Sequence, residues 1–131
     1  MAKTKQFTIA VENQPGTVAD IAKTLGDAKV NILSLVGTAQ GTGGTLLLIV
    51  EDARRAKKAL DAARIAYQET AAEEIELGNK PGTLAESLRK LAAKGVNLTS
   101  IHAMASKGGK KAMVVYTIEA APKAAAAASG S

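Results

Sequence analysis

Apolar residues along the chain follow either a period of two or the spacing of a helix, in short segments separated by turn residues. Phe7, Ile9 and Val11 alternate with polar or small residues, which predicts a half-buried strand. Asn, Pro and Gly then predict a turn at residues 13–16. From there to residue 28 the apolar positions have helical spacing, which predicts an amphipathic helix. The remaining elements predicted for the first half are strand 31–36, a Gly- and Thr-rich hairpin loop 37–44, strand 46–50, helix 53–63 and strand 65–71.

The order strand, helix, strand, strand, helix, strand is that of a ferredoxin-like unit. Such a βαββαβ unit is an α+β fold, in which a four-stranded antiparallel sheet carries both helices on one face. We therefore expect a first unit over residues 5–72.

The same pattern returns 66 residues later. The segment Glu12-Asn13-Gln14-Pro15-Gly16-Thr17 reappears as Gly78-Asn79-Lys80-Pro81-Gly82-Thr83, and Val30-Asn31-Ile32 reappears as Val96-Asn97-Leu98. A register that is kept through loop, helix and strand indicates one supersecondary unit present twice. We expect the second unit over residues 73–131.

The second unit is predicted to be shorter than the first. It has strand 73–77, which is almost continuous with strand 65–71 of the first unit, then helix 84–92, strand 97–104, a hairpin tip at 106–110 and strand 112–118. After these, only an Ala-rich segment at 122–128 follows, so we expect the second helix to be stunted and the fourth strand to be missing. An unpaired first strand favours association, and we expect the adjoining unit or a partner in a homodimer to cover it.

Composition excludes several kinds of site. The chain has no cysteine, which excludes disulfides, thiolate metal sites and cysteine nucleophiles. It lacks the apolar core of a signal peptide and any run of membrane-spanning length, so we expect a cytoplasmic protein with no membrane partner. The net charge of +5 makes an acidic partner conceivable, but aromatic residues are only 2% of the chain. Sheet aromatics that could stack RNA bases are therefore missing, and we expect no nucleic-acid partner.

The repeated polar residues have two possible roles. The Asn-x-Pro-Gly turn suits a helix cap, in which the Asn side chain accepts N–H groups at the helix start. Asn31 and Asn97 are harder to explain in this way, because Asn is disfavoured at the strand starts predicted there. We expect the turn and the start of the second strand to lie at one end of the sheet. There, helix N–H groups would bind the carboxylate of a small zwitterion, and Asn oxygens would bind its ammonium group.

From about Gln6 to Ile118 the sequence resembles a tandem pair of ACT domains, which are amino-acid-binding regulatory modules. The pattern Asn-x-Pro-Gly, amphipathic helix and Val-Asn-Ile/Leu carries this resemblance. It implies a free amino acid effector held at an interface between ACT units, no cofactor, and an enzyme of metabolism regulated in trans. The implied ligand-binding residues are Asn13, Gln14, Pro15, Gly16, Thr17, Asn31 and Ile32 in the first unit, and Asn79, Lys80, Pro81, Gly82, Thr83, Asn97 and Leu98 in the second. A serine-binding relative has a His two residues before the loop Asn. Val11 and Leu77 stand there in this chain, which indicates a more apolar effector or a weakened site.

No catalytic or metal site is predicted. His102 is the only histidine, and it lies on a predicted strand without an identifiable titratable partner. Glu73, Glu74 and Glu76 are expected to form a solvated strand edge. Two other classes of function stay open beside the amino acid sensor: a structural or interaction module with vestigial ligand sites, and a nucleic-acid binder.

Overall fold

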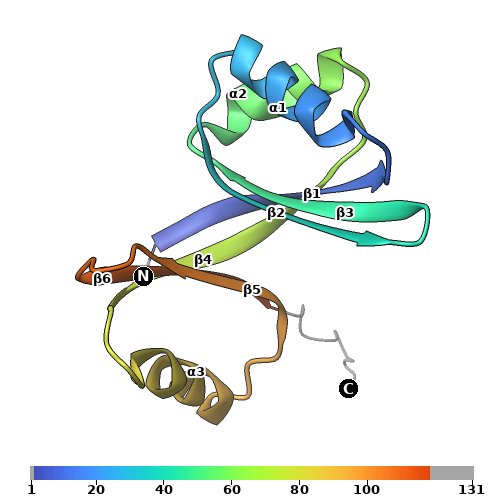
Figure 1. Ribbon diagram of the computed structural model, residues 1–131. Coiled ribbons are helices and arrows are strands. Elements are labelled where there is room, and N and C mark those ends of the chain that lie inside the picture. Colours follow the sequence, from blue (N-terminus) through green and yellow to red (C-terminus); the bar gives the residue numbers. More distant parts are fainter. Residues whose placement is uncertain (1, 119–131) are drawn as a thin grey trace. The chain divides into compact units, whose positions relative to one another are not determined.

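The structure is a computed structural model, and it describes residues 2–118 of the 131-residue chain. Six strands and three helices lie in this range (Figure 1). They are β1 (Ala2–Glu12), α1 (Thr17–Asp27), β2 (Ile32–Gln40), β3 (Gly43–Val50), α2 (Ala53–Ala62), β4 (Gln68–Gly78), α3 (Thr83–Ala93), β5 (Leu98–Ala105) and β6 (Lys111–Ile118). The predicted α+β class and the antiparallel strand pairing are confirmed.

The chain divides into two compact units, and β4 runs through the boundary between them. Among the described residues, 4–71 form the first unit, and 2–3 together with 72–118 form the second. In the first unit the strands lie in the order β2-β3-β1-β4, which is the order of a ferredoxin-like sheet. Both α1 and α2 cover the same face of this sheet (Figure 1).

The core of the first unit comes from the alternation and the helical spacing that the sequence shows. Residues at every second position of a strand point to one face, so one face of β1 and one face of β3 meet the apolar stripes of the two helices. The buried residues of this cluster are Phe7, Ile9, Ile21, Leu25, Val30, Leu46, Leu48, Val50, Ala56 and Leu60. Tyr67 packs edge-on against Phe7, with ring centroids 5.4 Å apart.

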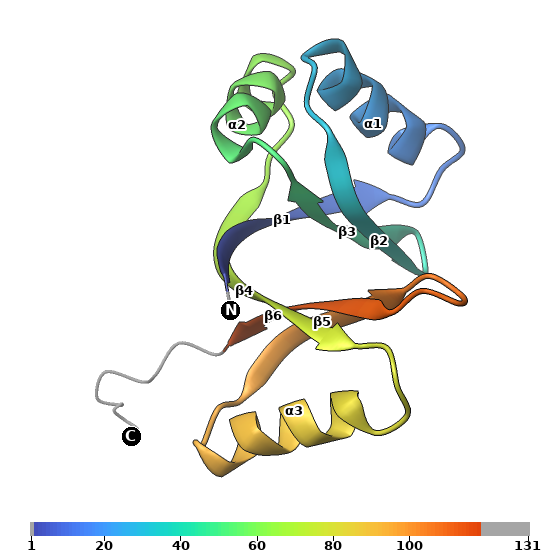
Figure 2. The same cartoon turned by 90° about the vertical axis from the view of Figure 1, so that its left-hand side faces the viewer.

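In the second unit α3 covers one face of the strands β4-β6-β5 (Figure 2). The first residues of β1 also belong to this unit, and the Lys3 ammonium lies 3.2 Å from the Glu73 carboxylate. The predicted Ala-rich segment at 122–128, and with it the predicted truncation of this unit, lies outside the described residues.

Two predictions about strand boundaries are wrong. The strands predicted as almost continuous at 65–71 and 73–77 join into the single strand β4, because no Gly or Pro interrupts the chain around the buried Ala72, and β4 begins at Gln68 rather than at residue 65. The loop predicted at 37–44 is reduced to its tip, because β2 and β3 stay paired up to Gln40 and Gly43. Gly37 permits this pairing, since a Cβ atom there would lie 3.0 Å from a methyl group of Leu46.

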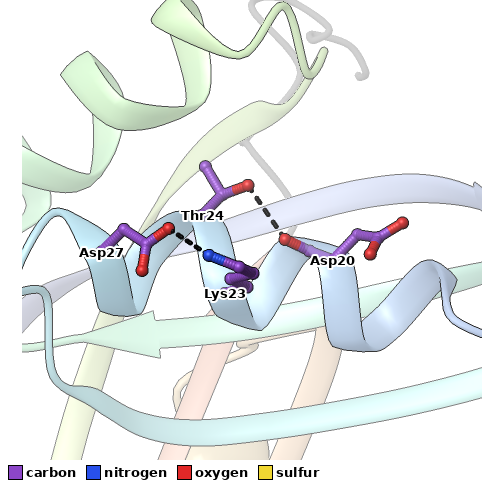
Figure 3. A network of polar contacts seen from close by, with 4 residues as sticks. All are labelled: Asp20, Lys23, Thr24 and Asp27. Carbon is purple, nitrogen blue, oxygen red and sulfur yellow. Dashed lines mark hydrogen bonds and ion pairs between the residues drawn. The ribbon is translucent and has the colours of Figure 1, made fainter.

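The polar face of α1 is exposed, as predicted. Lys23 Nζ lies 2.7 Å from Asp27 Oδ2, and the Thr24 hydroxyl donates a 2.9 Å hydrogen bond to the Asp20 carbonyl oxygen (Figure 3). The hydrogen bond and the negative charge of Asp27 raise the pKa of Lys23. The ion pair is solvated, so we expect it to add little to stability.

Candidate functional site

The repeated turns lead into α1 and α3 without a side-chain cap. The N-cap residues are Gly16 and Gly82, with left-handed φ values of 90° and 88°, and no side chain accepts a hydrogen bond from either helix start. The prediction that Asn caps these helices is therefore wrong. The contrast is α2, where the Asp52 carboxylate accepts a 3.0 Å hydrogen bond from the Arg55 N–H.

The Asn side chains instead fasten the turn to the neighbouring hairpin. Asn13 Nδ2 donates to the Gly41 carbonyl oxygen at 3.3 Å, and the Asn13 N–H donates to the Thr42 carbonyl oxygen at 2.9 Å. In the second unit Asn79 Nδ2 donates to the Gly109 carbonyl oxygen at 2.8 Å. Each Asn thus uses its amide nitrogen structurally, and its Oδ1 accepts no hydrogen bond from the described residues.

The first helical turns carry further unused hydrogen-bonding groups. At the start of α1 the Thr17 N–H donates to the Gln14 carbonyl oxygen and the Asp20 N–H donates to Gly16. The N–H groups of Val18 and Ala19 lie between these two and have no acceptor among the described residues. The equivalent groups of α3 belong to Leu84 and Ala85, and they too lack an acceptor there. Open N–H groups at a helix start favour an anion, and the helix dipole adds to this preference.

A groove lies beside each of these helix starts. The first groove has a volume of about 220 Å³ and is lined by Val11, Glu12, Asn13, Gln14, Val18, Gly37, Thr38, Ala39, Gly44 and Leu46. The second groove also has a volume of about 220 Å³ and is lined by Leu77, Gly78, Asn79, Lys80, Thr83, Leu84, Ala103, Met104, Ala105, Ala112 and Val114. From position 11 to position 39, each lining residue of the first groove has its counterpart 66 residues later in the second.

The grooves explain where several predicted site residues lie. Asn13 and Gln14 line the first groove, and Asn79, Lys80 and Thr83 line the second. The Thr83 hydroxyl donates toward the Gly78 carbonyl oxygen at 2.7 Å and the Lys80 carbonyl oxygen at 3.0 Å, which holds this turn together.

The far ends of β2 and β5 complete the groove walls, and these residues were not predicted as part of a site. Gly37, Thr38 and Ala39 lie on β2, and Ala103, Met104 and Ala105 lie at the equivalent places on β5. The only signal in the sequence was the recurrence of small residues there.

Asn31 and Asn97 do not line the groove of their own unit. The Asn31 carbonyl oxygen accepts the Glu51 N–H just beyond the end of β3, whereas Asn13 bonds to Thr42 just before its start. These two places are separated by about 30 Å along the strand. The expectation that the turn and the start of the second strand share one end of the sheet is therefore wrong. The helix runs back along β1 before β2 begins, which places Asn31 with Ile32, and likewise Asn97 with Leu98, at the opposite end.

Apolar side chains are half exposed at matching positions beside both grooves. Val18 is 42% exposed and its counterpart Leu84 is 39% exposed. On the strands, Leu35 is 37% exposed and its counterpart Ile101 is 40% exposed. Because β2 and β5 are the outer strands of their units, these residues lie beside an open strand edge in each.

Other candidate features do not assemble into a catalytic centre among the described residues. The two ring nitrogens of His102 are buried and have no hydrogen-bond partner there, and burial lowers the pKa of this histidine. Residues 2–118 contain no group of three or more His, Cys, Asp or Glu side chains that could hold a metal ion. None of the described helices combines the length and the apolar character needed to cross a membrane.

Comparison with known proteins identifies similar chains. The family described as the ACT domain pair matches residues 2–127. A solved protein structure from Bacteroides thetaiotaomicron has a TM-score of 0.82 and 30% sequence identity, and the match covers 92% of this chain and 83% of that one. The regulatory subunit of aspartate kinase from Thermus thermophilus has a TM-score of 0.67 at 16% identity, and the match covers 89% and 84% of the two chains. No curated protein sequence matches the chain.

Proposed function

The chain belongs to the ACT domain pair family, and on this basis we propose that it is a regulatory protein that binds a free amino acid in the groove of each repeat. The observation that carries the proposal is the duplicated groove. In both repeats a small cavity is lined by an Asn whose Oδ1 accepts no hydrogen bond from the described residues and by a first-turn residue, Val18 or Leu84, whose N–H has no acceptor there. Apolar side chains also line each cavity.

These groups suit the two charges of a zwitterion. The α-carboxylate would accept hydrogen bonds from the two open N–H groups at the helix start, as anions do at helix N-termini. The α-ammonium group would donate to the Oδ1 atom of Asn13 or Asn79. The side chain of the amino acid would then contact the apolar floor, which is formed by Val11 and Leu46 in the first groove.

The expected affinity is modest. Three charge-assisted hydrogen bonds contribute about 1.5–3 kcal/mol each before ordering costs. After those costs, a dissociation constant in the roughly micromolar to millimolar range is expected. A volume of about 220 Å³ is also below the roughly 300–1,000 Å³ of sites for drug-sized ligands, which favours a molecule of amino acid size.

We further propose that the protein is a homodimer and that the partner copy completes the site. Asn31 and Asn97 lie far from the groove of their own unit, so they would contribute to ligand binding only at the groove of another unit, and we propose that a partner copy supplies it. The half-exposed Leu35 and Ile101 beside the open strand edges favour such an association. The structural likeness to regulatory subunits of aspartate kinase supports a regulatory role, with an enzyme of metabolism as the target.

Heat denaturation with each of the twenty amino acids at millimolar concentration tests the proposal. A ligand that binds only the folded state raises the free energy of unfolding and therefore the melting temperature. The gain in free energy is about 2.7 kcal/mol at a ligand concentration of one hundred times its Kd. The double variant Ala39→Leu, Ala105→Leu fills both grooves at exposed strand positions and should abolish the shift. Ala62→Leu is the matched control, because Ala62 is exposed on α2 and lines neither groove. A folded protein whose midpoint responds to none of the twenty would refute the proposal.

A structural or interaction module is the second candidate function. It is favoured by the exposed apolar residues next to β2 and β5, which would serve association without any ligand. Sedimentation separates the two functions. A dimer that dissociates in the double variant Leu35→Lys, Ile101→Lys, and that binds no amino acid, would support the interaction module instead.

A further inference from the structure

The two grooves have the same volume but rims of opposite charge. Glu12 lines the first groove, and the residue 66 positions later is Gly78. Gln14 lines the first groove, and its counterpart in the second is Lys80. Glu12 is the only ionised side chain lining the first groove, and Lys80 is the only one lining the second.

Both charges are available to a ligand. The Glu12 carboxylate accepts a 3.1 Å hydrogen bond from the neutral Gln14 amide and forms no ion pair with a described residue. The Lys80 ammonium forms neither a hydrogen bond nor an ion pair with a described residue. Nothing in residues 2–118 therefore neutralises either rim.

The acidic residues in the first helical turns do not separate the repeats. Asp20 stands in the first turn of α1, and its counterpart Glu86 stands in the first turn of α3. Their charges are equal and affect both grooves alike. The residues that line the two grooves therefore differ by the exchange of one negative charge for one positive charge. Lys110 and Lys111, in the hairpin beside the second turn, add positive charge near the second groove, whereas the first repeat has Thr42 and Gly43 at these places.

We propose that the grooves bind amino acids of opposite side-chain charge: the first an amino acid with a cationic side chain, and the second an amino acid with a carboxylate side chain. This inference rests on the proposed function, because it assumes that a free amino acid occupies each groove. The groups that would hold the α-carboxylate and α-ammonium are the same in both repeats. The side chain of the ligand is therefore the part that would interact with Glu12 in the first groove and with Lys80 in the second.

The expected selectivity follows from Coulomb's law. Both rims are exposed to water, where two unit charges about 5 Å apart interact weakly. Reversing the charge of the ligand changes an attraction into a repulsion, and the combined effect is a preference of about tenfold in each groove. Salt screens exposed charges, so this preference should nearly vanish at about 1 M ionic strength.

NMR titration of the full chain tests this assignment, with the side-chain amide signals of Asn13 and Asn79 as reporters of the two grooves. Arginine, glutamate and neutral glutamine are the probes. Arginine should perturb the Asn13 signal at about tenfold lower concentration than glutamate does, and glutamate should show the same preference at Asn79. Glutamine should lie between them in both grooves.

The chain itself offers reciprocal variants. Gln14 and Lys80 are counterparts, and both positions are exposed. Each of the variants Lys80→Gln and Gln14→Lys introduces the residue that stands at the equivalent position of the other repeat, so both variants should fold. Lys80→Gln should weaken the preference for glutamate at Asn79, and Gln14→Lys should weaken the preference for arginine at Asn13.

Equal affinities of both grooves for all three probes would overturn the inference and leave the proposed function standing. A preference that survives Lys80→Gln and Gln14→Lys unchanged would also overturn it. If neither reporter responds to any free amino acid, the proposed function fails and the inference fails with it.

Discussion

Replacing Lys29 by glycine should stabilise the first unit. Lys29 follows the last turn of α1 with a φ of 64°, in the left-handed region that L side chains rarely adopt. Its N–H donates to the Gly26 carbonyl oxygen and the next N–H, of Val30, donates to Leu25, which is the hydrogen-bond pattern of a Schellman turn. Gly95 occupies the same position after α3, with a φ of 76° and the same pattern of bonds.

The magnitude follows from two opposing effects. A side chain in the left-handed region costs roughly 1–2 kcal/mol through the contact of its Cβ atom with the backbone. Glycine removes that contact but gains more freedom in the unfolded chain, which offsets about 0.4–1 kcal/mol. The net gain expected for Lys29→Gly is therefore about 1 kcal/mol, or about 4 °C in Tm for a unit of this size.

Urea denaturation followed by circular dichroism measures this gain as a higher midpoint at unchanged slope. Lys29→Ala is the control for the lost charge, because alanine keeps the Cβ atom and should leave stability nearly unchanged. Gly95→Ala is the reciprocal variant, and it should lose about 1 kcal/mol. A Lys29→Gly protein no more stable than the Lys29→Ala protein would refute the argument that strain at this φ is what glycine relieves.

Three further variants test other parts of the fold. Gly26→Ala should raise the free energy of unfolding by about 0.5–1 kcal/mol. A Cβ atom at this position has no neighbour within 4 Å, and the other repeat has Ala92 at the equivalent position. A loss of stability would contradict this prediction. Gly44→Ala should lower the free energy of unfolding by more than about 1 kcal/mol, because the new Cβ atom would collide with the backbone carbonyl of Thr38. Thermal unfolding measures this loss, and a neutral result would mean that the hairpin shifts freely. Burial holds the pKa of His102 below its ordinary value of about 6.5, so the unfolded chain takes up the proton first as the pH falls. Stability should therefore fall as the pH drops below about 6.5, and His102→Val should flatten this part of the stability curve; an unchanged curve would assign the pH dependence to other groups.

The repeated turn shows how far the sequence leads toward the site. The sequence singled out Asn13 and Asn79 because polar residues recur there at a fixed period. It did not reveal that their amide nitrogens bond to hairpin carbonyls, because Gly41 and Gly109 are about thirty residues away along the chain. The small residues that form the groove walls, such as Gly37, were missed for the same reason.

The order of the elements, their inward faces and the duplication can all be predicted from the amino-acid sequence. Strands and helices have fixed periods of two and 3.6 residues, so burial leaves a local trace that a single chain displays. The tertiary structure alone decided which ends of those elements meet. Asn31 lies at the far end of the sheet from Asn13 because the helix between them runs back along β1, and such a path depends on packing between distant segments.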